Sequence, residues 1–150
     1  MAIVTIAQVL VCAENFEQML AEFYANLSHQ STKEGVRLLT DYMSRHRQRT
    51  HNALMELPLK SLNRIYRTPL RYETHAANCR CFEGIELEPN ATAAKVLDVA
   101  IKFDECLVKL YRQVVCQDVD KEVKGLFESL IRWEEHDEVE LKKIKAMDYF

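Results

Sequence analysis

Apolar residues recur three and four positions apart in four stretches of the sequence, with polar residues between them. This spacing places the apolar side chains on one face of an α-helix. Pro58 follows the second stretch and would end that helix, and Ser31, Thr32, Asn90 and Thr92 are residues that can cap the helix following them. We therefore expect four amphipathic helices, over residues 4–30, 32–57, 92–117 and 119–146.

The second half of the chain repeats the first. When the sequence is shifted by 87 positions, residues 5–57 align with residues 92–144 without a gap. Val9 then meets Val96, and Tyr24 meets Tyr111. Because loop lengths drift between unrelated helix pairs, the absence of a gap favours two similar hairpins.

Two hairpins joined by a crossover of residues 58–91 predict a four-helix bundle. The chain holds 3 Gly and 3 Pro among 150 residues, which is too few turn residues for a sandwich, a barrel or a dinucleotide-binding fold. We expect an all-α fold and a single domain over residues 1–150, with the two hairpins related by a pseudo-twofold axis.

The net charge and the cysteines indicate which binding partners and which cellular compartment to expect. The net charge is −3, which disfavours nucleic acid as a partner. We expect neither a membrane span nor a targeting segment, because no apolar run is long enough and the apolar start lacks a basic region. The spacing of the 5 cysteines is not that of a disulfide framework. We expect reduced thiols, including Cys79 and Cys81, in a cytoplasmic protein.

Several charged residues fall on the apolar faces of the predicted helices. At 100° per residue, Glu17, Asp104, Glu134 and Asp137 all point toward the interior, and so does Arg47. Unpaired charges are costly to bury, so this cluster needs a metal ion or ion-pair partners. The competing interpretation is that the helices rotate slightly and these side chains reach solvent at the edges of the apolar faces. His46 also lies on the apolar face of its helix, where a hydrogen-bonded core histidine is the commoner arrangement. His51 and His136 lie off the apolar faces.

This arrangement resembles the ferritin-like superfamily, and most closely its rubrerythrin-like branch. In that family a carboxylate stands seven residues before a tyrosine, and the next helix carries Glu-x-x-His. Both elements occur twice, and the six ligands hold two irons. Here Glu17 precedes Tyr24, and Asp104 precedes Tyr111, at that spacing.

The remaining family positions depart from the pattern. Glu134 is kept, Asp137 replaces a histidine, and Arg47 and Thr50 stand at the other two ligand positions. An alternative register, which aligns 48–51 with 133–136, keeps both histidines but loses both glutamates. An arginine brings a fixed positive charge into the space that a metal would occupy. It can instead neutralise neighbouring carboxylates by bidentate hydrogen bonds.

The resemblance and its departures together imply a function. We expect a ferritin-like bundle with a partly lost di-iron site, acting as a non-catalytic binding, regulatory or stress-related protein and forming a homodimer. The alternative is a metal-dependent oxidoreductase or iron-binding protein, with no cofactor beyond a single Fe or Mn ion. Its ligands would be Glu17, Asp104, Glu134 and Asp137, whose oxygen donors favour a hard cation or Mn. A scaffold acting through Cys79 and Cys81 is a third class.

Overall fold

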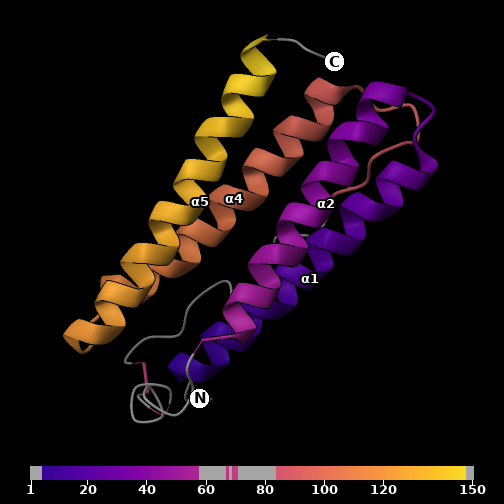
Figure 1. The fold of residues 1–150 in the computed structure, drawn as a ribbon. Helices are drawn as coiled ribbons and strands as arrows, with labels where there is room; N and C mark the ends of the chain where they lie inside the picture. The colour runs from indigo at the N-terminus through magenta and orange to yellow at the C-terminus, as the bar shows by residue number, and fades with distance from the viewer. Residues whose placement is uncertain (1–4, 58–66, 68, 71–83, 148–150) are drawn as a thin grey trace.

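The structure is a computed structural model that describes residues 5–57, 67, 69–70 and 84–147. The described part of the chain is built from four long helices and contains no strand (Figure 1). These are α1 (Ile6–Gln30), α2 (Glu34–Met55), α4 (Ala93–Val115) and α5 (Lys121–Met147). The all-α class and the four predicted helices are confirmed, with ends that differ from the predicted ones by no more than a few residues. None of the described helices is long and apolar enough to cross a bilayer.

The chain forms two antiparallel hairpins that pack into one bundle. α1 packs along α2, and α4 packs along α5 (Figure 1). Edge-to-face aromatic contacts join the hairpins, with Phe16 and Phe23 of α1 both against Phe103 of α4. All four helices contribute to a continuous apolar core.

The internal repeat is visible in the burial pattern. Every buried residue of α1 has a buried counterpart 87 positions later in α4. Tyr24 and Tyr111, for example, are both among the largest fully buried side chains. The helix starts repeat as well, since Thr5 caps α1 and Thr92 caps α4, each accepting from the backbone N–H three residues later.

The start of α2 differs from the sequence expectation. Lys33 is the N-cap residue and makes no side-chain capping bond. Ser31 instead belongs to the end of α1, where its backbone N–H donates to Leu27 and its side-chain oxygen accepts from the Lys33 N–H. The tight connection between α1 and α2 therefore uses the serine to hold the turn. Most of the crossover predicted over residues 58–91 lies outside the described residues.

Candidate functional site

Four charged side chains, one from each helix, meet in the middle of the bundle. Glu17 comes from α1, Arg47 from α2, Asp104 from α4 and Glu134 from α5, and each lies on the buried face of its helix. Their exposed fractions are 0% for Glu17 and Asp104, 3% for Arg47 and 2% for Glu134. The interior position that the sequence predicted for these four residues is confirmed. The alternative, in which they reach solvent at the edges of the apolar faces, is wrong.

Arg47 is the hub of this cluster. Its Nη1 lies 3.1 and 3.2 Å from the two carboxylate oxygens of Glu17, and 3.2 and 3.1 Å from those of Glu134. Its Nη2 donates to Oδ1 of Asp104. One guanidinium thus links three carboxylates from three other helices, which fits the planar, multiply donating geometry of arginine.

The cluster contains three carboxyl groups but only one guanidinium. Burial raises the pKa of Glu17 well above 4.5, and the nearby Glu134 carboxylate raises it further, against the lowering effect of Arg47. Burial acts to lower the pKa of Arg47, but the charges of Glu134 and Glu17 prevail and raise it. Arg47 therefore stays charged, and the raised pKa of Glu17 favours its protonated form, which reduces the excess negative charge.

Two buried polar atoms of the described residues have no hydrogen-bond partner. One is Oδ2 of Asp104 and the other is the hydroxyl oxygen of Tyr24. Burial raises the pKa of Tyr24 and that of Tyr111, so both phenols keep their protons at neutral pH. Orphaned buried polar atoms are rare in folded proteins and are a common feature of sites that receive a ligand, an ion or a water molecule.

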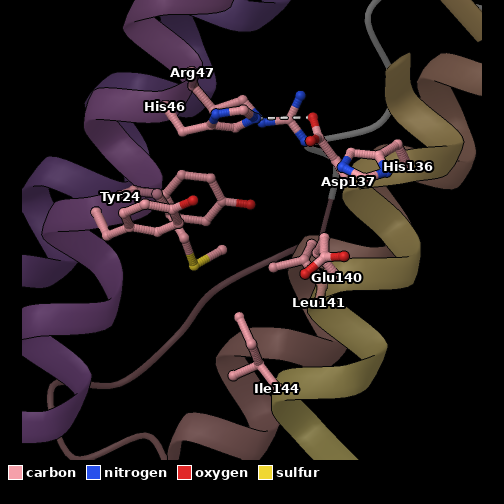
Figure 2. A pocket seen from close by; sticks show the side chains of 10 residues that line it. Tyr24, His46, Arg47, His136, Asp137, Glu140, Leu141 and Ile144 are labelled. Atoms are coloured by element: carbon pink, nitrogen blue, oxygen red, sulfur yellow. Dashed lines mark hydrogen bonds and ion pairs between the residues drawn. The ribbon is translucent and has the colours of Figure 1, made fainter. Parts of the chain in front are cut away.

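Asp137 does not join the Arg47 cluster. It is half-buried, and its Oδ2 lies 2.9 Å from Nε2 of His46, so that this pair links α5 to α2 (Figure 2). The His46 ring also stacks on Tyr42. Thr50, at another family ligand position, is half-buried and donates to the backbone oxygen of His46. Helical periodicity predicted that Asp137 lies toward the buried face of α5, but it did not predict the contact with His46.

The other candidate side chains lie apart from the cluster. His136 is exposed, as expected, whereas His51 is half-buried with its Nδ1 2.8 Å from the Glu14 carbonyl oxygen. Cys106 is disulfide-bonded, so the expectation of a fully reduced set of thiols is wrong. Cys106 is half-buried rather than in the core. Cys79 and Cys81 lie outside the described residues.

A pocket of about 300 Å³ opens between α2 and α5 beside the cluster (Figure 2). Met43, Leu141 and Ile144 provide apolar walls, and Tyr24 and Arg47 reach it from the interior. A second hollow, of about 380 Å³, shares His46, His136 and Asp137 with the first and is also lined by Trp133. The His46–Asp137 pair therefore lies between two hollows on this side of the bundle.

The six family ligand positions do not fit a two-iron centre. The Arg47 guanidinium stands where a metal would have to approach Glu17, Asp104 and Glu134, and Thr50 is bonded to its own helix backbone. Within the described ranges, no three His, Cys, Asp or Glu side chains are arranged so that they could hold a metal ion. The buried cluster is thus an ion-pair network built on the positions that the resemblance assigns to ligands.

Comparison with solved structures identifies the fold. A crystal structure described as that of a ferritin-like diiron-carboxylate protein from Thermotoga maritima superposes with a TM-score of 0.64, covering 97% of each chain at 14% sequence identity. The bundle described above is therefore a ferritin-like four-helix bundle. The sequence matches no protein-family model and no curated protein.

Proposed function

We propose that this protein is a ferritin-like bundle in which an arginine–carboxylate cluster has taken the place of a di-iron centre, and that it acts by binding rather than by oxidative catalysis. The observation that carries the proposal is the contact of Arg47 with Glu17, Asp104 and Glu134. A guanidinium cannot be deprotonated in a protein, so its positive charge repels a metal ion at every working pH.

Four further parts of the proposal rest on the sequence: the rubrerythrin-like relationship, the dimer, the cellular location and the biological role. The rubrerythrin-like relationship is supported by the spacing of Glu17 to Tyr24 and of Asp104 to Tyr111, all four of which are buried. A homodimer and a cytoplasmic location complete the proposal, although the disulfide of Cys106 removes the support that reduced thiols would give to that location. A regulatory or stress-related role is compatible with a binding protein of this kind.

Metal analysis of the purified protein tests the proposal. The full chain is purified without chelator, incubated anaerobically with Fe²⁺ or Mn²⁺, desalted and assayed by elemental mass spectrometry. We expect well below one equivalent of either metal per chain. One or two tightly held equivalents would overturn the proposal. The Arg47→Glu variant is the matched control, because it places a carboxylate at the same position and shows that the assay detects binding.

One observation favours the alternative of an iron- or manganese-binding protein. Asp104 has an unpartnered carboxylate oxygen, and three buried carboxylates face a single guanidinium. A single divalent ion on Glu17, Asp104 and Glu134 would use that oxygen and the excess charge in place of Arg47, whereas Asp137, the fourth predicted ligand, is bonded to His46 and lies outside this set. This alternative predicts one equivalent of metal, with oxidase or peroxidase activity that depends on it.

A further inference from the structure

The pocket between α2 and α5 has the features of a small-molecule site. Its volume of about 300 Å³ is at the lower end of the range for ligand pockets. Met43, Leu141 and Ile144 give it an apolar side. On the interior side it reaches Tyr24, whose side chain is fully buried yet whose hydroxyl has no hydrogen-bond partner. In Figure 2 the Tyr24 side chain extends from its helix toward α5 and the pocket.

The charges around the pocket decide which ligand it suits. Arg47 lines it, but this guanidinium already serves three buried carboxylates. His46 is bonded to Asp137, so that neither offers an uncompensated positive charge. Glu140 adds a further carboxylate at the exposed mouth. Acidic groups therefore exceed cationic ones, both in the buried cluster and at the opening, and an anionic ligand would be repelled.

We propose that this pocket binds a small organic cation, a primary ammonium group on a short apolar body. The ammonium group has three N–H donors and no acceptor, so it can donate to the Tyr24 oxygen while its charge offsets the excess of carboxylates. The apolar body would lie against Met43, Leu141 and Ile144. The exposed ring of Tyr42, which also lines the pocket, adds an aromatic face that attracts cations.

This inference rests on the proposed function, because a metal ion among the carboxylates would cancel the charge that attracts the amine. The two can fail separately. Tightly held metal would overturn the proposed function, whereas metal-free protein that shows no preference for an amine would overturn the ligand assignment alone. Metal content is therefore measured on the same sample that is used for binding.

Calorimetric titration of the full chain with three probes of equal length tests the assignment. The probes are n-hexylamine, 1-hexanol and hexanoate, at pH 8, where the amine is charged and hexanoate is ionised. We expect saturable one-to-one binding of hexylamine, weaker binding of hexanol and no binding of hexanoate. Hexanoate or hexanol binding as tightly as hexylamine, or no saturable binding of the amine, would overturn the assignment.

Two tyrosine variants locate the site. Tyr24→Phe removes only the hydroxyl and should weaken hexylamine binding about tenfold or more, as expected for a hydrogen bond to a charged group. Tyr111→Phe is the matched control, since Tyr111 is the buried repeat counterpart and does not line this pocket. Ile144→Trp, which fills the half-buried side of the pocket, should abolish binding without touching the charged cluster. Equal affinities of the Tyr24 and Tyr111 variants, or unchanged binding by the Ile144 variant, would contradict the location.

Discussion

Arg47 is the residue on which the interior charge balance depends. Among the residues that the structure describes, it alone supplies positive charge to three carboxylates that are almost completely removed from water. In such a setting the loss of one partner is costly, because the remaining charges stay buried without compensation. The stability of the fold is therefore expected to depend more on this side chain than on any exposed arginine of the same helix.

Arg47→Ala should lower the free energy of unfolding by about 3–5 kcal/mol at neutral pH. The loss should shrink as the pH falls, because protonation relieves the orphaned carboxylates. Urea unfolding followed by circular dichroism measures both effects. Arg45→Ala is the control, since Arg45 pairs with Asp41 on the exposed face of α2 and should contribute less than about 1 kcal/mol. Equal losses for the two variants would show that the Arg47 pairs contribute little.

Arg47→Glu should be less stable than Arg47→Ala in metal-free buffer at neutral pH, because it adds a fourth carboxylate to the buried cluster. Added Mn²⁺ or Fe²⁺ should raise its unfolding midpoint, since the substitution restores an oxygen ligand at a family ligand position. Thermal melts with and without metal check this. The wild type should show no such shift, and a metal effect of the same size in both proteins would contradict the expectation.

The pH dependence of stability should report on Glu17. Burial raises its pKa in the folded state above 4.5, so the folded protein holds this proton more tightly than the unfolded chain does. The stabilisation from protonation is complete below about pH 4.5. It is lost as the pH rises toward the folded pKa, by at most about 1.4 kcal/mol per pH unit.

Glu17→Gln isolates this contribution, because glutamine resembles the protonated acid. The unfolding free energy of the wild type minus that of Glu17→Gln should fall as the pH is raised above 4.5. Urea melts of both proteins at several pH values give this difference. A constant or rising difference would mean that Glu17 is ionised in the folded protein throughout that range.

At the scale of the helices, the first helix of each hairpin begins with a threonine cap. Thr5 and Thr92 each accept a hydrogen bond from a backbone N–H of the first turn, and the Gln8 side-chain oxygen accepts one from the Thr5 backbone N–H. Thr5→Ala and Thr92→Ala should each lower the unfolding free energy by about 1 kcal/mol. Thr32→Ala, at an exposed position that caps no helix, should change it by less than about 0.5 kcal/mol. Denaturant melts of the three variants compare these effects directly.

The four helices were predictable because the residues that define each helix lie close together in the sequence. Periodicity gives the helix faces, and the 87-residue shift pairs Glu17 with Asp104 and Arg47 with Glu134 at the same depth. The site required more than periodicity. Whether His46 meets Asp137 depends on how α2 and α5 are rotated against each other, which no spacing within one helix specifies. The same holds for the Tyr24 hydroxyl, because a missing partner is a property of three-dimensional surroundings.

At the scale of the whole molecule, the homodimer stays a prediction. Large apolar side chains such as Leu38 and Trp133 are exposed on α2 and α5, with exposed fractions of 65% and 53%. Light scattering coupled to size-exclusion chromatography should give a mass twice the 17.5 kDa of one chain. A single-chain mass at micromolar concentration would contradict the dimer.

Because the two hairpins are similar, each could in principle be duplicated to form a bundle of two identical halves. A bundle made of two copies of the first hairpin would bring Glu17 and Arg47 together twice, and its interior would be electrically balanced. A bundle made of two copies of the second hairpin would instead collect Asp104 and Glu134 twice, with no buried cation of its own. The first duplication yields a neutral scaffold, whereas the second cannot fold at neutral pH without bound protons or imported cations. The present chain has one copy of each hairpin, so that Arg47 of the first hairpin offsets part of the negative charge that Asp104 and Glu134 of the second hairpin bring into the interior.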